Sequence, residues 1–304
     1  MEEGDYTAIQ MIGKGAFGEV HKGVLNKTGQ IVAIKVIKRG DTMKEWNVMA
    51  RLAGHQHILR PIALVEGPKH VAYVLEFAKG GDLFSYLGDK GFEVPEEDVR
   101  TITRQIVAAL LHINACGVAH LDLKLENVLF KDASHSHVLL ADFGAAEVLG
   151  ESSAPITRPV GTPQYMAPEV LRCCRGVEDV ADDAVPRGFG MRADNWSLGV
   201  LVYVLLHGCF PFAAAGQPRS PNAQLQKILE TRSPFTEAAQ PSCCSKEAHG
   251  FISKLLQISP AHRMTLAEAR EHPWLRGAQT CKHDLDDLAA ESSSAQGGKR
   301  PRLG

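Results

Sequence analysis

Residues 120–127 form a polar stretch that holds two carboxylates, an ammonium and an amide close together in sequence. Asp122 and Lys124 lie two residues apart, Asn127 follows three residues later, and another acid, Asp142, comes after the next apolar segment. In a loop held by the strand after it, such side chains can converge on one point. A carboxylate can accept a hydroxyl proton, an ammonium can neutralise phosphate, and an Asp/Asn pair can bind a metal ion. The set therefore suits phosphoryl transfer, where positioning and charge neutralisation supply nearly all of the catalysis.

Together with the Asp-Phe-Gly run at 142–144, this stretch resembles the catalytic loop and metal-binding motif of the eukaryotic protein kinases. The resemblance implies that Asp122 orients the hydroxyl and accepts its proton, and that Lys124 neutralises the γ-phosphate. It also implies that Asn127 and Asp142 hold Mg²⁺. A lysine at position 124 is typical of kinases that phosphorylate serine or threonine rather than tyrosine.

The elements that would position these residues begin with a predicted hairpin. Residues 6–37 alternate in the manner of strands, and Gly13, Gly15 and Gly18 form a G-x-G-x-x-G run within them. Small residues let backbone amides approach phosphate oxygens. Alone, the run also fits a dinucleotide site or an ordinary glycine-rich hairpin. A valine, Val20, and a second strand follow rather than a helix, which disfavours the dinucleotide site.

A lysine, Lys35, stands at the end of the next apolar strand, where a buried ammonium needs an anionic partner. We expect that partner to be Glu45, which opens a helical pattern. In the kinases this lysine binds the α- and β-phosphates, the glutamate holds it, and both belong to the catalytic set. Their separation, 45 − 35 = 10 residues, is short for the family and predicts a trimmed loop before the helix. Asp41 is the other acid nearby, but it is shorter and is expected ahead of the helix.

Residues 71–77 are predicted to form a buried strand, and the resemblance makes the segment after it the hinge between two lobes. It implies that Leu75 lies behind the adenine of ATP and that the backbone of Glu76 and Ala78 binds the base. The side chains expected to pack on the two faces of adenine are Ile12, Val20, Ala33 and Leu129. Without the resemblance, these are simply apolar core residues.

The remainder of the chain is predicted to be helical. A proline and three acids at 95–98 begin an amphipathic helix. Residues 161–169 resemble the end of a kinase activation segment, with Thr162 aligning the catalytic loop and Glu169 pairing with Arg263. The stretch 172–190 is an insertion relative to most kinases, and we expect it to be a surface loop.

The predicted fold class is therefore α+β, the two-lobed protein kinase fold. A small antiparallel-sheet N-lobe is expected at about 6–77 and a larger, mostly helical C-lobe at about 80–276, within one domain at 6–276. Within the family, the stretches 161–170, 197–204 and 272–275 look most like the calcium/calmodulin-dependent kinase group. Residues 277–304 turn acidic, then Ser/Gly-rich, then basic, a composition that cannot bury a core and predicts disorder.

Composition excludes several other classes of protein. A net charge of -2 argues against a nucleic-acid partner, and the most apolar run, 198–206, is too short to span a bilayer, so no membrane association is expected. No signal peptide is seen at the N-terminus. The seven cysteines match neither a disulfide framework nor a zinc site, and the 13 histidines show no ligand spacing. We therefore expect a cytoplasmic protein with reduced thiols. Basic residues at 299–302 leave a nuclear location open.

The predicted function is transfer of the γ-phosphate of ATP, with Mg²⁺, to serine or threonine of protein substrates. A pseudokinase, which would bind partners without catalysis, is one alternative. The short approach to the helix and Leu121 are the grounds for it, whereas retention of Lys35, Asp122 and Asp142 argues against it. A small-molecule kinase is disfavoured by the complete activation segment.

Two acidic positions bear on substrate choice. Asp82 follows the hinge and Glu126 lies in the catalytic loop, and both resemble acids that contact substrate arginines in basophilic kinases. We therefore expect a preference for basic residues N-terminal to the target hydroxyl. The alternative is that Asp82 binds only the ribose of ATP.

Regulation is expected to differ from that of the calcium/calmodulin-dependent kinase group. Calmodulin targets are basic amphipathic helices, but residues 284–288 are acidic, so calmodulin is not expected as a partner. Leu121 stands where most kinases have the arginine that binds a phosphorylated activation segment. Phosphorylation of Ser152, Ser153 or Thr157 should therefore not be required. Arg158 is the nearest replacement for that arginine.

Overall fold

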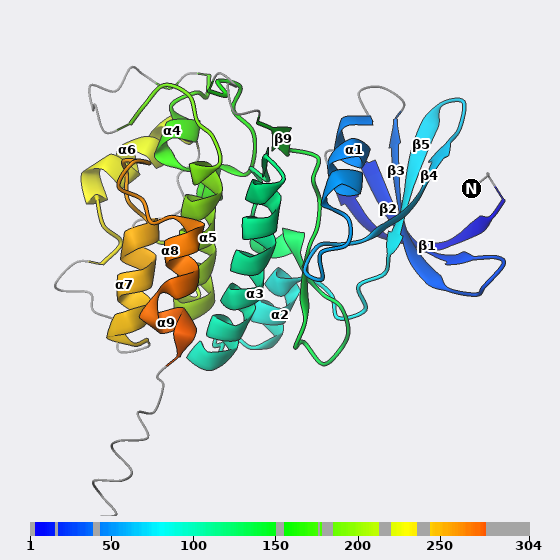
Figure 1. Cartoon of the computed structure of the whole chain (residues 1–304), viewed down its shortest axis with the longest axis horizontal. Coiled ribbons are helices and arrows are strands. Elements are labelled where there is room, and N and C mark those ends of the chain that lie inside the picture. The colour runs from blue at the N-terminus through cyan, green and yellow to red at the C-terminus, as the bar shows by residue number, and fades with distance from the viewer. Residues whose placement is uncertain are drawn as a thin grey trace, which may run out of the picture.

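The computed structural model describes residues 4–15, 18–38, 43–149, 155–175, 177, 185–212, 220–235 and 244–277. They form two lobes, one built mainly of strands and the other mainly of helices (Figure 1). This arrangement confirms the predicted α+β, two-lobed class. The expected disordered tail lies outside the described residues from position 278 onward.

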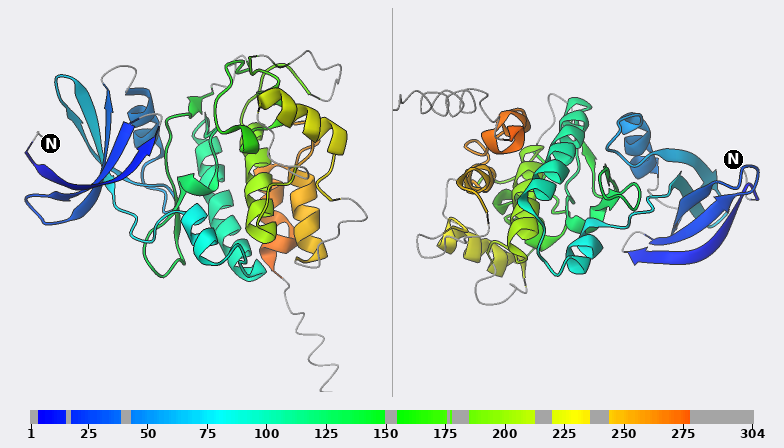
Figure 2. Two further views of the ribbon diagram at one scale, coloured as in Figure 1. Left: turned by 180° about the vertical axis from the view of Figure 1, so that it is seen from behind. Right: turned by 90° about the horizontal axis from the view of Figure 1, so that it is seen from below.

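The N-lobe is an antiparallel sheet in the order β1-β2-β3-β5-β4. Side chains of β3 alternate between two apolar clusters, because successive residues of a strand face opposite sides. Val32 and Ile34 pack in a small cluster on one face, and Ala33 faces the main core. Among the described residues of this lobe, α1 is the helix that accompanies the sheet (Figures 1 and 2). The elements are β1 (Tyr6–Gly15), β2 (Gly18–Leu25), β3 (Ile31–Lys38), α1 (Met43–Leu52), β4 (Pro61–Glu66) and β5 (His70–Glu76).

The C-lobe is built around α5, whose residues from Ala193 to Leu206 are all buried. Helices α3 and α7 pack against it, and Gly199 lets α7 approach because a Cβ there would meet Leu255 and Leu256 at 2.9 Å. No helix among the described residues is long and apolar enough to cross a bilayer. The helices are α2 (Leu83–Asp89), α3 (Glu96–Ala115), α4 (Pro168–Leu171), α5 (Arg192–His207), α6 (Pro221–Thr231), α7 (Lys246–Leu255), α8 (Leu266–Glu271) and α9 (Pro273–Arg276).

Short strands and 3-10 turns packed on α2, α3 and α5 carry the polar loops of the C-lobe. The hairpin of β7 (Val128–Phe130) and β8 (Val138–Leu140) follows the catalytic loop, and β6 (Val118–Ala119) pairs with β9 (Glu147–Val148). The 3-10 turns are η1 (Leu125–Asn127) and η2 (Pro163–Tyr165).

A buried ion pair joins α4 to the segment before α8, as the sequence predicts. Arg263 contacts Glu169 at 2.6 and 2.9 Å, and the two side chains are 0% and 1% exposed. The guanidinium also lies over the ring of Trp196, 5.3 Å from its centroid. Two hydrogen bonds to one carboxylate and the ring beneath the guanidinium stabilise the buried charge.

The predicted surface loop at 172–190 is wrong at its C-terminal end. Val185 and Phe189 are buried, and Phe189 exchanges two backbone hydrogen bonds with Ile156 of the activation segment, at 3.0 and 2.9 Å. Burial of these two apolar side chains is favourable because it removes their surface from water, so this end of the stretch packs into the core. Residues 178–184 lie outside the described part of the chain.

Candidate active site

A cleft of about 590 Å³ lies between the lobes and collects residues from five parts of the sequence. Its walls come from β1 and β2, from β3, from the hinge, from the catalytic loop and from the segment before Phe143. Of the residues predicted from sequence, the cleft is lined by Ile12, Gly13, Gly18, Val20, Ala33, Lys35, Leu75, Glu76, Ala78, Asp82, Asp122, Lys124, Glu126, Asn127, Leu129 and Asp142. Gly15 and Glu45 do not line it: Gly15 pairs with Gly18 at the hairpin end, and Glu45 lies behind Lys35.

The ammonium of Lys35 lies between two carboxylates. Its Nζ is 2.6 Å from Oε1 of Glu45 on α1 and 2.8 Å from Oδ1 of Asp142. The trimmed loop before α1 therefore does not prevent the predicted Lys35–Glu45 contact. Asp41, the other acid considered, lies outside the described residues.

Burial and charge act in opposite directions on these three groups. Burial lowers the pKa of Lys35, but the Asp142 and Glu45 carboxylates outweigh it and leave that pKa above its ordinary value. Burial raises the pKa of Asp142, but Lys35 prevails and holds it below its ordinary value. For Glu45, burial prevails over Lys35 and raises the pKa. Of the two acids, Glu45 therefore takes up a proton first as the pH falls.

Asp122 is the centre of a second polar group. Its Oδ2 lies 2.9 Å from Nζ of Lys124, and its Oδ1 accepts a hydrogen bond from Oγ1 of Thr162 at 2.8 Å. Lys124 also donates to Thr162, at 3.1 Å. Thr162 thus joins the activation segment to the catalytic loop, as its motif predicts. The arrangement holds one carboxylate and one ammonium side by side at the edge of the cleft.

The backbone of the catalytic loop is held by a buried carboxylate. Asp194 of α5 accepts hydrogen bonds at 2.8 Å from the amides of both His120 and Leu121. Leu121 has φ +65°, a conformation that L-residues seldom adopt, and these two bonds help to maintain it. The ring of His120 contacts the carbonyl of Ala141 at 3.1 Å, which joins the loop to the strand before Asp142.

Asn127 and Asp142 offer oxygen atoms at the base of the cleft. The amide nitrogen of Asn127 donates to the backbone oxygen of Asp122 at 2.8 Å, so the Oδ1 atom is left as an acceptor. The carbonyl of Asn127 accepts a hydrogen bond from the amide of Ala141 at 2.9 Å. This bond brings Asn127 and Asp142, the neighbour of Ala141, to one end of the β7–β8 hairpin. A carboxylate and an amide oxygen are ligands suited to Mg²⁺.

Glu76 lines the hinge side of the cleft together with Phe77, Ala78 and Lys79. Its Oε1 accepts a hydrogen bond from the amide of Arg60 at 2.6 Å, which turns the carboxylate away. Beyond it, the amides of Lys79 and Gly80 donate to the carbonyls of Lys131 and Phe130. These bonds attach the hinge segment to the β7–β8 hairpin.

Sequence reasoning missed two local roles of acidic residues. Asp82 is the N-cap of α2 and accepts from Ser85 N and Oγ at 2.8 and 2.9 Å; the Asp-x-x-Ser spacing before a helix was the available signal. Glu147 in β9 binds Lys44 of α1 at 2.6 Å and Arg158 at 2.7 Å. No spacing rule relates Lys44 to Glu147, so only the folded chain reveals this contact.

Comparison with known proteins agrees with this geometry. The family described as "Protein kinase domain" matches residues 6–275. A probable myosin light chain kinase of Dictyostelium discoideum is 35% identical over 279 residues, covering 90% of this chain and 82% of that protein. The serine/threonine-protein kinase RAD53 of Saccharomyces cerevisiae is 34% identical and is 35% covered. The calcium/calmodulin-dependent serine/threonine-protein kinase 1 of rice is 33% identical and is 46% covered. This chain therefore spans less than half of the last two.

Proposed function

This chain belongs to the protein kinase family and is an ATP-dependent protein serine/threonine kinase, and we propose that the cleft between its lobes carries the catalysis. One observation supports this more than any other. Lys35 of β3, Asp122 and Asn127 of the catalytic loop, and Asp142 before Phe143 line a single cleft. Side chains at these positions can bind phosphate, accept a proton and hold a metal ion together.

In this proposal, Asp122 accepts a hydrogen bond from the substrate hydroxyl, orients it and takes its proton. The hydroxyl oxygen then bonds to the γ-phosphorus as the bond from that phosphorus to the departing ADP oxygen breaks. Lys124, 2.9 Å from Asp122, neutralises charge on the transferred phosphate. Lys35 binds the α- and β-phosphates, and Glu45 keeps its ammonium in place. Protein kinases generally use Mg²⁺, which would neutralise phosphate charge here while held by Asn127 and Asp142.

Adenine binding is assigned to the inner part of the cleft. Backbone groups of Glu76 and Ala78 would hydrogen-bond the base, and Asp82 would lie near the ribose. The glycines at 13, 15 and 18 would let the hairpin approach the phosphates. Apolar contacts to the two faces of the base are assigned to Ile12, Val20, Ala33 and Leu129.

The proposal also covers the bounds of the catalytic domain, the substrates and the cellular location. We assign the catalytic domain to residues 6–276, with the N-lobe at 6–77 and the C-lobe at 80–276. Its substrates are proteins that carry serine or threonine. A cytoplasmic location, with the nucleus as an alternative, and independence from calmodulin remain predictions from the sequence.

The test is turnover by purified enzyme with Asp122→Asn and Asp142→Asn, measured with radiolabelled ATP on a peptide array. Each variant should lower kcat by at least ~10², because each removes a proton acceptor or a charge-stabilising group. Asp89→Asn, at an exposed position at the end of α2, is the matched control and should leave kcat unchanged. Near wild-type turnover in either cleft variant would contradict the assignment. Nucleotide binding without turnover in the wild type would support the pseudokinase alternative.

A further inference from the structure

Two histidines and a cysteine meet at the junction of α5 and α7, away from the catalytic cleft. His207 ends α5, Cys244 precedes α7, and His249 lies in the first turns of α7. One ring nitrogen of each histidine and the sulfur of Cys244 all lie within 4.8 Å of one another. Among the described residues, this is the group of histidine, cysteine and acid side chains that comes close enough to share a metal ion. All three side chains are half-buried.

The hydrogen bonds of His207 direct one nitrogen lone pair toward this group. Its Nδ1 lies 3.0 Å from the carbonyl of Tyr203, which can only accept, so Nδ1 carries the proton. The other nitrogen, Nε2, is then unprotonated in the neutral ring and lies 3.8 Å from Sγ of Cys244. An imidazole fixed in this way by a backbone carbonyl is typical of histidines that bind metals.

His249 has a buried nitrogen that no side chain or backbone group satisfies. Its Nε2 is inaccessible to solvent and has no hydrogen-bond partner among the described residues. Such groups are uncommon in folded proteins, because a buried polar atom without a hydrogen bond destabilises the fold. A thiol hydrogen bond explains the contact between Cys244 and His207 alone. A bound ion would account for the whole group.

Packing holds both rings in place. His207 stacks on Tyr203 with a centroid distance of 4.1 Å and an interplanar angle of 13°. Phe235 packs against the same group, 4.5 Å from the centroid of the His249 ring. Rings restrained by neighbours lose little further freedom when they bind an ion.

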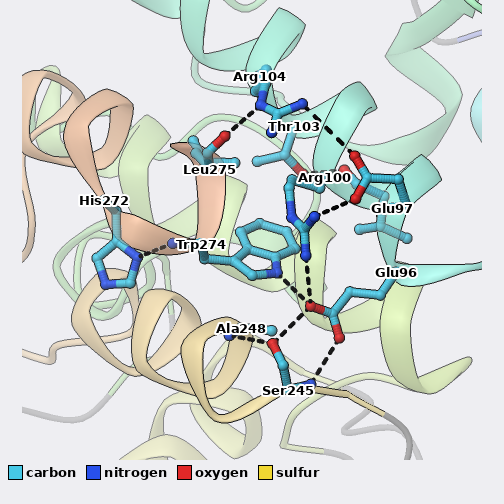
Figure 3. Close-up of polar contacts among 11 residues, drawn as sticks. Glu96, Glu97, Arg100, Thr103, Arg104, Ser245, Ala248, His272, Trp274 and Leu275 are labelled. Atoms are coloured by element: carbon cyan, nitrogen blue, oxygen red, sulfur yellow. Dashed lines mark hydrogen bonds and ion pairs between the residues drawn. The ribbon is translucent and has the colours of Figure 1, made fainter. Parts of the chain in front are cut away.

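A clamp formed by Glu96 fixes the backbone next to Cys244. The carboxylate of Glu96, in the first turn of α3, accepts from the amide and the hydroxyl of Ser245, both at 2.7 Å. Nε1 of Trp274 donates to the same carboxylate at 2.8 Å. Figure 3 shows Ser245 and Trp274 pointing toward Glu96 from α7 and α9. Because Ser245 is also the N-cap of α7, the clamp sets the positions of both Cys244 and His249.

We propose that His207, Cys244 and His249 bind Zn²⁺, with a water molecule at the fourth position. Imidazole and thiolate are the ligands that zinc favours, whereas calcium and magnesium require oxygen. A tetrahedral centre with ordinary Zn–S and Zn–N lengths places sulfur and nitrogen roughly 3.6 Å apart, close to the 3.8 Å found between Sγ and Nε2. Such a centre would tie the start of α7 to the end of α5, and its ligands lie outside the residues that line the catalytic cleft.

The test uses the purified full chain, stripped of metal and titrated with Co²⁺ as a spectroscopic substitute for Zn²⁺. We expect one strongly bound Co²⁺ with the visible absorption of a tetrahedral site and a thiolate-to-cobalt charge-transfer band, both lost when Zn²⁺ is added. Cys244→Ser should abolish the charge-transfer band, and His249→Gln should weaken Zn²⁺ affinity at least tenfold. In the wild type, Zn²⁺ should raise the Tm, because an ion that binds only the folded state stabilises it.

The matched control is Cys116→Ser. The Cys116 sulfur also lies 3.8 Å from a histidine nitrogen, Nε2 of His112, but that nitrogen is 3.2 Å from the carbonyl of Leu52 and is therefore a donor. This variant should keep the cobalt spectrum. Circular dichroism and kinase activity without added zinc establish that each variant is folded. A spectrum that survives Cys244→Ser, or a wild type that binds zinc no more tightly than both variants, would overturn the proposal.

Discussion

The ammonium of Lys44 lies 2.6 Å from the carboxylate of Glu147, and this contact ties helix α1 to strand β9 of the activation segment. Arg158 approaches the same carboxylate from further along the segment, at 2.7 Å. Lys44 is the immediate neighbour of Glu45, which holds Lys35. A single carboxylate therefore links the activation segment to the helix that positions the phosphate-binding lysine.

We predict that Glu147→Gln lowers kcat/KM about three- to tenfold, because α1 loses a tie that keeps Glu45 against Lys35. This loss of kcat/KM corresponds to roughly 1 kcal/mol of transition-state stabilisation, in keeping with a partly exposed ion pair. Steady-state kinetics on one peptide substrate would measure it. Lys44→Met should give a similar loss that is not additive with the first, and Glu93→Gln, at an exposed position, should have no effect. Fully additive losses would contradict a shared mechanism.

Activation-segment phosphorylation is predicted to be dispensable. Leu121 has no donor or charge with which to bind a phosphate and is 7% exposed, and Arg158 already pairs with Glu147. Thr157 is exposed, and Ser152 and Ser153 lie outside the described residues. Phosphatase treatment, or the triple alanine variant of these three positions, should change kcat/KM less than threefold. A loss beyond about tenfold, roughly 1.4 kcal/mol, would mean that a basic group reads the phosphate after all.

Glu126 is predicted to select basic substrates. It lines the cleft with an exposed side chain, whereas Asp82 is occupied by Ser85 at the N-terminus of α2. A carboxylate in this position can form a charge-assisted pair with an arginine N-terminal to the target hydroxyl. A positional-scanning library should show this preference for wild type, and Glu126→Gln should reduce it several-fold with little change toward neutral peptides. An equal response of both peptide classes would argue against the pairing.

Glu96 is predicted to make the stability of the C-lobe sensitive to acid. Burial raises its pKa, but the hydrogen bonds from Ser245 and Trp274 and the charge of Arg100 outweigh burial and hold the pKa below its ordinary value. A depressed pKa contributes stability that is complete above about pH 4.3 and is lost as the pH falls through the lower folded-state value. Glu96→Gln should therefore destabilise the protein by about 1–3 kcal/mol at pH 7.

The measurement is urea unfolding of wild type and Glu96→Gln at pH 7 and at acidic pH. The difference between their midpoints should shrink as the pH falls, because the wild type loses the contribution that the variant already lacks. Glu97→Gln is the control, since the Glu97 side chain is 64% exposed. The same destabilisation in both variants, or a difference that does not depend on pH, would contradict the prediction.

The sequence predicts the lobes and the cleft because their signals are local or belong to ordered motifs. The glycine run, the strand lysine and the loop at 120–127 each show in a short window, and the contact between Lys35 and Glu45 is found as expected. The Glu169–Arg263 pair and the contact of Thr162 with Asp122 are also found as the kinase motifs predict. The chemical roles of the cleft residues remain predictions that the variants above would test.

Contacts between residues that no motif relates could not be predicted. His207 and Cys244 are separated by 37 residues and come together only because α7 packs on α5, so the histidines show no ligand spacing in the sequence. The burial of residues near the end of the 172–190 stretch could not be predicted either. Phe189 is paired through its backbone with Ile156 of the activation segment, and no motif relates these two residues.

The hydrogen bonds at the hinge also determine where the two lobes can rotate. Lys79 and Gly80 are bonded to the β7–β8 hairpin of the C-lobe, and Gly81 accepts from Phe130 at 2.8 Å. Gly80 lies so close to Asp132 that a Cβ would collide with its carbonyl. These residues therefore move as part of the C-lobe. We expect opening and closing to be taken up by backbone torsions at Phe77 and Ala78, so the pivot lies beside the adenine position and small rotations there give large displacements at the distant glycine hairpin.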